Sequence, residues 1–191
     1  MLDKKDFAGI KKELDQNHEL SESLYRQSRD LVGTTKKLIF ALHRGSLGDA
    51  EKLVPDMEKL KKKMEDGVKK SGSFKSHNAY TIAMQEYTEA AAYLHFVKNN
   101  KIPTRSQLKV PAEEYVSGLC DLSGELVRKA VDLSIKGDSK GVGAIKNFAE
   151  DFYGMLLELN PYGELRKKAD QARWNLNKLE DLVYEGTLRR R

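Results

Sequence analysis

The chain has 191 residues, which is enough for one domain with a buried core. Charged residues make up 33% of it and hydrophobic residues 39%, the composition of a charge-rich helical protein. The net charge of +5 favours an anionic partner without requiring one, since acidic residues are nearly as numerous as basic ones. The single cysteine, Cys120, excludes an internal disulfide and predicts a reducing, cytoplasmic setting. With no apolar run near the roughly 20 residues that span a bilayer, and no signal-peptide pattern, we expect no membrane partner.

The first 70 residues predict two helices joined by a turn at residues 45–49. Residues 6–44 carry apolar side chains at helical and then heptad spacing: Phe7, Ile10, Leu14, Leu24, Leu31 and Leu38. The second helix takes Pro55 near its first turns, where proline is tolerated best. A solvated face and a phosphate-binding face explain its lysines about equally well. These lysines are Lys59, Lys61, Lys62, Lys63, Lys69 and Lys70.

A third helix is predicted from about residue 74 to residue 99, with an unusual pair of acids. Glu86 and Glu89 fall on a stripe of otherwise apolar residues, which also contains Ile82, Tyr93 and Phe96. Acids on a solvated face are more often surrounded by lysine and other polar residues. We therefore expect this carboxylate pair to face inward.

A second pair of acids lies on the helix predicted to start near Pro111. Asp121 and Glu125 are four residues apart, so their like charges stack on one side of the helix and repel. Gly118 and Gly124 fall on the same side, where each costs about 1 kcal/mol relative to alanine. Two penalties on one surface predict that something packs closely there and that a cation offsets the repulsion.

The rest of the chain predicts two more long helices and no strand. Residues 137–139 are predicted to end one helix and begin the next, which continues to about residue 159. Asn160 and Pro161 are the predicted N-cap and first residue of the last helix, which Gly186 would end. We predict a single all-α domain over residues 1–191, a bundle of six or seven helices.

The four carboxylates can form one site if their two helices pack as neighbours. Oxygen ligands select hard cations such as Mg²⁺ or Mn²⁺, which can hold a phosphodiester and activate a water molecule. Acid pairs at this spacing also occur in purely structural networks, so that explanation stays open. A di-iron bundle is a weak alternative, because no histidine of the chain has a glutamate three residues before it.

Several segments resemble the translin superfamily, in family order and over nearly the whole chain. The most specific are Gln85-Glu-Tyr-Thr-Glu89-Ala and Gly118-Leu-Cys-Asp-Leu-Ser-Gly-Glu125-Leu. Three shorter segments accompany them: Ser28-Arg29-Asp30, Ile39-Phe-Ala-Leu-His43-Arg44 and Lys178-Leu-Glu-Asp-Leu-Val-Tyr184. The two specific segments match the nuclease branch of the family, that of translin-associated factor X, whereas translin has apolar residues at several of the acid positions.

The resemblance implies seven helices, a closed homo-octameric shell and Mg²⁺- or Mn²⁺-dependent endonucleolytic cleavage of RNA, single-stranded or in a short duplex, held inside it. It implies that the catalytic and metal-binding acids are Glu86, Glu89, Asp121 and Glu125. Lys75, His77 and Arg128 correspond to positions near nucleic acid, and Arg128 could equally pair with an acid. The alternative is a translin-like protein that binds RNA or single-stranded DNA without cleaving it. The chain lacks the long insert before Pro111 of the eukaryotic factors and resembles compact prokaryotic members that assemble alone.

Overall fold

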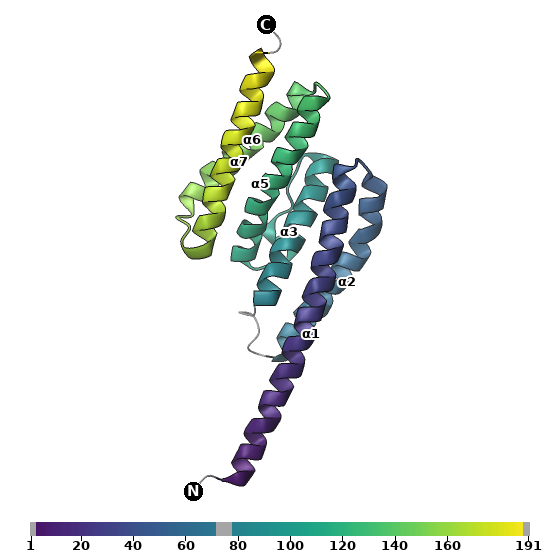
Figure 1. The fold of residues 1–191 in the computed structure, drawn as a ribbon, viewed down its shortest axis with the longest axis vertical. Coiled ribbons are helices and arrows are strands. Elements are labelled where there is room, and N and C mark those ends of the chain that lie inside the picture. The colour runs from purple at the N-terminus through teal and green to yellow at the C-terminus, as the bar shows by residue number, and fades with distance from the viewer. Residues whose placement is uncertain (1–2, 72–77, 189–191) are drawn as a thin grey trace. The chain divides into compact units, whose positions relative to one another are not determined.

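The computed structural model describes residues 3–71 and 78–188, and within them it contains seven α-helices and no strand (Figure 1). The all-α fold predicted from the sequence is therefore confirmed. No helix in these ranges is both long and apolar enough to cross a membrane. The helices are α1 (Lys4–His43), α2 (Leu47–Ser71), α3 (Asn78–Asn99), α4 (Arg105–Leu108), α5 (Ala112–Ile135), α6 (Ser139–Glu158) and α7 (Gly163–Leu188).

The helices divide between two compact units, residues 1–87 and residues 88–191. The boundary falls inside α3, so the first half of that helix belongs to the N-terminal unit and the second half to the C-terminal unit. The organisation into a single domain stays a prediction.

In the N-terminal unit, α1 and α2 form an antiparallel hairpin (Figure 1). α1 buries one stripe at heptad spacing, and burying one leucine stabilises the fold by roughly 1.5–3 kcal/mol. The buried positions of the stripe are Leu24, Ser28, Leu31, Thr35, Leu38 and Leu42. Met57 and Met64 of α2 fill the facing positions. The start of α3 is tied to α1, because the Ser28 hydroxyl donates a hydrogen bond of 2.8 Å to the carbonyl of Ala79.

In the C-terminal unit, α5, α6 and α7 pack against one another as a three-helix group. Its centre contains side chains that are at most 1% exposed: Leu122, Leu126, Leu156 and Leu179. Phe148 of α6 packs on Phe96 of α3, with ring centroids 5.4 Å apart. The Tyr115 hydroxyl donates to the carbonyl of Pro103 at 2.8 Å, which anchors the connector that precedes α5.

Two predicted details of helix position are wrong. Asn160 is not the N-cap of the last helix, because it adopts a left-handed backbone (φ +47°) just after α6, and α7 begins only at Gly163. Asparagine tolerates this conformation better than most residues, so it can end a helix as well as begin one. Gly186 does not end the last helix, because α7 continues to Leu188. Pro55 lies in the third turn of α2.

Candidate metal and nucleic-acid site

The acids of α3 lie on a largely buried part of the helix. Glu89 is 9% exposed and Glu86 is partly exposed one turn earlier, while Tyr87, Thr88 and Ala90 between and beside them are buried. The inward orientation predicted for Glu89 is thus observed. A buried carboxylate is costly unless other groups compensate its charge. Such a side chain is suited to hold a cation in a site that excludes most water.

Asp121 pairs with a lysine that lies 47 residues further along the chain. The Lys168 ammonium of α7 donates to Asp121 Oδ2, and the two side chains are 33% and 31% exposed. The sequence predicts a cation beside the acids of α5, and in the structure an ammonium takes that position. Lys168 is therefore a site residue that the sequence analysis missed.

A sequence signal for Lys168 exists in the spacing of α7. Lys168, Ala172, Asn175 and Leu179 follow one another at intervals of four, three and four residues, and the last three are buried. A lysine that continues a buried stripe points toward the interior, where it needs an acidic partner.

α7 also packs against the acid-bearing side of α5, at Gly124. A Cβ on Gly124 would lie 3.6 Å from Nδ2 of Asn175, so what approaches this surface is a helix of the same chain. The Asn175 amide donates to the Ser123 hydroxyl at 2.8 Å, and that hydroxyl donates to the carbonyl of Cys120 at 2.6 Å. These bonds hold α7 against the turn of α5 between Asp121 and Glu125.

Glu125 lies close enough to Tyr93 of α3 for its charge to act on the phenol. Burial is the main cause that raises the pKa of Tyr93, and the Glu125 carboxylate raises that pKa further, while Arg128 lowers it. Tyr93 lies one turn after Glu89 and is completely buried. Tyr93 and Glu89 are thus both buried residues of α3, four positions apart. Arg128 is exposed one turn beyond Glu125.

The donors fit a hard divalent cation by their chemistry. Among residues 3–71 and 78–188, no three carboxylate, imidazole or thiol groups lie close enough to hold a metal ion together. Mg²⁺ does not require such a cage, because it commonly keeps several waters and uses one or two carboxylates together with substrate phosphates. The all-carboxylate set of α3 and α5 meets that requirement. The other two predicted nucleic-acid residues, Lys75 and His77, lie outside the described residues.

Cys120 next to Asp121 has no role as a nucleophile. It is 1% exposed, and burial together with the charge of Asp121 raises the pKa of its thiol to about 12. The reactive thiolate is therefore scarce at neutral pH.

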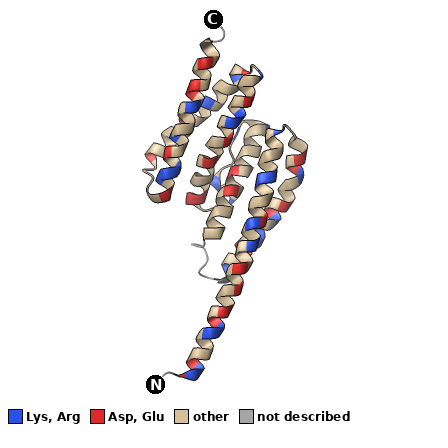
Figure 2. Cartoon of the chain, viewed as in Figure 1, with Lys and Arg blue, Asp and Glu red and all other residues tan. Residues whose placement is uncertain are grey.

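A groove lined by basic residues lies between α1 and α2 in the N-terminal unit. Figure 2 shows basic positions along both helices. Arg29 and Lys37 line the groove from α1, and Lys59 and Lys63 line it from α2, enclosing about 560 Å³. Two acids, Asp30 and Asp56, also border it, which leaves a net excess of two positive charges. This excess of positive charge suits the groove to a phosphate backbone.

The structure separates the lysines of α2 into two kinds. Lys61 is 5% exposed, its Nζ lies 2.5 Å from Oε1 of Glu65, and the ammonium sits 5.2 Å from the ring centroid of Tyr87. It stabilises the core between α2 and α3. Lys59 and Lys63 are exposed along the groove, so the phosphate-binding explanation applies to them and the structural one to Lys61.

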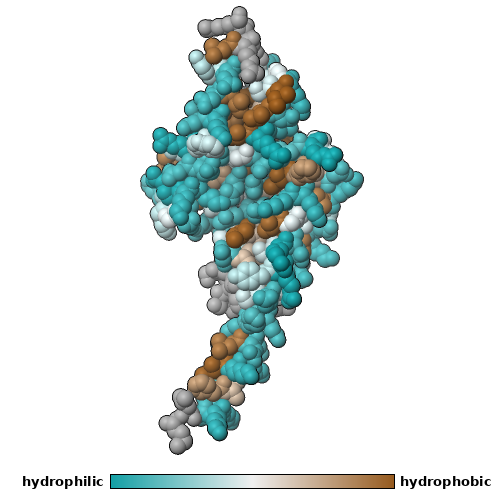
Figure 3. Space-filling view, in the orientation of Figure 1, coloured by the Kyte–Doolittle hydropathy of each residue, from teal (hydrophilic) through white to brown (hydrophobic). Residues whose placement is uncertain are grey.

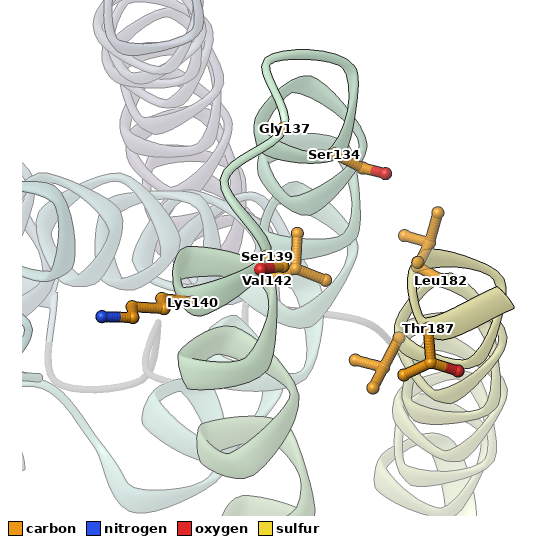
Figure 4. A pocket seen from close by; sticks show the side chains of 9 residues that line it. Ser134, Gly137, Ser139, Lys140, Val142, Leu182 and Thr187 are labelled. Carbon is orange, nitrogen blue, oxygen red and sulfur yellow. The ribbon is translucent and has the colours of Figure 1, made fainter. Parts of the chain in front are cut away.

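A further pocket of about 480 Å³ lies in the C-terminal unit, where α5 ends, α6 begins and α7 ends (Figure 4). Ser134, Lys140, Val142, Leu182 and Thr187 are among its lining residues. Its lining, among the residues that the structure describes, contains no carboxylate and none of the predicted site residues. It is therefore separate from the acids of α3 and α5.

The protein is therefore of an all-helical class that carries pairs of carboxylates on two helices, here α3 and α5. A family model described as the Translin family matches residues 19–190. The chain therefore belongs to the translin family, in the branch of translin-associated protein X. The resemblance found in the sequence is confirmed.

Relatives with this match come from animals and archaea. Translin-associated protein X of Pongo abelii is 28% identical over 227 residues, which cover 93% of this chain and 76% of that protein. An uncharacterized protein of Methanocaldococcus jannaschii is 29% identical over 164 residues, covering 82% of this chain and 72% of the relative.

Solved structures share the complete fold. Apo-NeC3PO superposes with a TM-score of 0.87 and 28% sequence identity, covering 97% of this chain and 98% of that one. AfC3PO in a complex with duplex RNA superposes with a TM-score of 0.84 and 24% sequence identity, with the same coverage of both chains. This similarity is one of fold.

Proposed function

We propose that the protein is a metal-dependent endoribonuclease that cleaves RNA inside a homo-octameric shell. The observation that carries the proposal is the burial of Glu89, a carboxylate that is only 9% exposed among buried neighbours on α3. Membership in the branch of translin-associated protein X supports the same activity. Glu86, Glu89, Asp121 and Glu125 are the proposed catalytic residues, and Mg²⁺ or Mn²⁺ is the proposed cofactor.

Each acid has a distinct part in this proposal. Glu86, Glu89 and Asp121 would hold the ion, and Glu125 would complete the set or accept a proton from the attacking water. When bound, the ion supplies positive charge to the scissile phosphodiester and lowers the pKa of a water molecule. Arg128, which is exposed one turn beyond Glu125, is proposed to contact a phosphate of the RNA.

RNA binding has separate support in the N-terminal unit. The groove between α1 and α2 carries four basic side chains, and a protein of the same fold has been solved with duplex RNA. Lys75 and His77 are proposed to add to the contact, and single-stranded DNA is a further ligand of the same chemistry. The likeness to NeC3PO over nearly both whole chains supports an assembly of identical copies.

The test is cleavage of a labelled single-stranded RNA by the purified protein with Mg²⁺, Mn²⁺ or EDTA, together with a binding assay under the same conditions. We expect cutting with either metal and none with EDTA, while binding persists in all three. Cleavage that continues in EDTA would contradict the proposal.

A second candidate function is RNA binding without cleavage. The pairing of Lys168 with Asp121 favours this function, because the lysine ammonium already neutralises the charge of one proposed metal ligand. RNA that is bound equally well with Mg²⁺, Mn²⁺ and EDTA, and is cleaved under none of these conditions, would establish this alternative.

Replacing Lys37, Lys59 and Lys63 with glutamine should weaken RNA binding and flatten its salt dependence. Each lost phosphate contact on a single strand reduces the slope of log K against log salt by about 0.7, so the triple variant should lose about 2. Binding titrations at several salt concentrations measure this slope. A matched control replaces Lys136, Lys146 and Lys167, each of which pairs with an acid on the C-terminal unit. An equal loss in both variants would show that the groove has no special role.

A further inference from the structure

The N-terminal part of α1 is a helix with no covering partner in the described chain. Residues 3–19 are all exposed, whereas the same helix is buried on one side from Leu24 onward. The change occurs where α2 ends. Gly67 of α2 lies against Leu24, and α2 finishes four residues later at Ser71. We call residues 4–19 the arm.

The arm continues the buried stripe of α1 without a break in register. From Phe7 to Leu42 the stripe alternates intervals of three and four residues, and its members after residue 23 are buried in the hairpin. Phe7, Ile10 and Leu14 occupy the same positions on the arm and are 52%, 43% and 63% exposed. Figure 3 shows these apolar side chains gathered near the N-terminal end of the molecule. A seam that packs inside the chain therefore extends onto a surface that residues 3–71 and 78–188 do not cover.

The arm is built to be helical. The Asp3 carboxylate caps it by accepting the backbone N–H of Lys5 at 2.8 Å. Capping favours a helix that starts at this residue. An isolated helix of this length is marginal in water, so a packed apolar face would contribute most of its stability.

The charges beside the seam match a second copy of the same arm in parallel orientation. With Phe7 and Leu14 at heptad position a and Ile10 at position d, the g positions are Asp6 and Glu13. The e positions are Lys11 and His18. In a parallel pair each g residue meets the e residue five positions later on the partner, which places Asp6 beside Lys11 and Glu13 beside His18. In an antiparallel pair acids would meet acids.

We propose that the arm is a docking surface for the arm of a second copy of this chain, paired in parallel. The inference rests on the proposed homo-oligomer, and it names one of the contacts that hold it. Two heptads are few for a coiled coil by themselves, so the arm pair extends a larger contact between copies.

The first test is Leu14→Gln in the full chain, with the oligomer followed by sedimentation over a range of protein concentrations. Because Leu14 is exposed within one chain, the variant should fold normally, and circular dichroism checks this. We expect the oligomer to dissociate at a concentration at least about tenfold higher than wild type, since a buried leucine side chain is lost. Lys12→Gln, on the opposite face of the arm, is the matched control.

The second test fixes the orientation. Ile10→Cys should form a cross-link between two copies, because facing d positions are neighbours in a parallel pair. Wild type controls for Cys120, which is buried. Asp6→Lys should weaken the oligomer, and adding Lys11→Glu should restore it.

The outcomes separate this inference from the proposed function. A wild-type oligomer that Leu14→Gln leaves unchanged rejects the arm contact and leaves the nuclease proposal standing. Dissociation without an Ile10→Cys cross-link rejects the parallel pair, because the arm then meets another surface. A wild-type protein that is monomeric at every concentration overturns both the arm contact and the shell, whatever its activity on RNA.

Discussion

Glu89→Gln is expected to abolish metal-dependent RNA cleavage, by at least about a hundredfold. Glutamine keeps the shape of the buried side chain but removes the charge that would hold the cation. Loss of a residue that only supports a metal ligand costs 10- to 100-fold, so loss of a ligand should cost at least that much. Cleavage of labelled RNA under saturating Mn²⁺ measures the effect, with RNA binding and oligomer mass recorded for the same preparation.

The control for this variant is Glu114→Gln. Glu114 on α5 is 8% exposed, as buried as Glu89 at 9%, and is outside the proposed site. The control should retain cleavage, which shows that removing a buried carboxylate does not by itself inactivate the protein. Full activity in Glu89→Gln would refute the four-acid site.

Lys168→Met is expected to bind Mn²⁺ roughly tenfold more tightly than wild type. An ammonium and a divalent ion on one carboxylate repel by about 1–2 kcal/mol even when screened as in water. The opposing effect is the loss of a group that orients Asp121. An ion pair whose two side chains are about a third exposed contributes only about 0–1 kcal/mol, so the repulsion dominates. Electron paramagnetic resonance of free Mn²⁺ in the absence of RNA measures the affinity.

Lys167→Met makes the same charge change at the next residue. Lys167 pairs with Glu164 on the surface of α7 and should leave Mn²⁺ binding unchanged. Weaker binding in Lys168→Met would show that the lysine positions Asp121 for the ion. Unchanged binding would show that Asp121 is not a ligand.

The helices were predictable from the sequence because each depends on the spacing of apolar residues within a short segment. Leu24, Leu31 and Leu38 recur at heptad spacing in the sequence, and they are buried at that spacing in α1. The burial of Glu89 was predictable for the same reason, since its neighbours on the helix are apolar. Asn160 was not, because asparagine suits both the start of a helix and a left-handed residue after its end.

The partners of the site residues required information from distant parts of the chain. Lys168 meets Asp121 only because α7 packs on α5, a contact across 47 residues that helical spacing does not specify. In the same way, the sequence shows that α2 is rich in lysine, but it does not show which lysines face α1 and which one packs against α3. The convergence of all four acids stays a prediction, to which the response of Tyr93 to Glu125 adds one link.

Lys61 has a consequence for how the sequence can vary. Its ammonium is enclosed by Glu65 and the ring of Tyr87, a space fitted to a slender side chain with a compact charge. Arginine has a broad planar head and five donors to satisfy, so it does not replace lysine there without repacking. At Lys59 and Lys63, where the charge faces a groove, arginine serves a phosphate equally well. Homologous chains should therefore exchange the two basic residues freely at positions 59 and 63 and keep lysine at position 61.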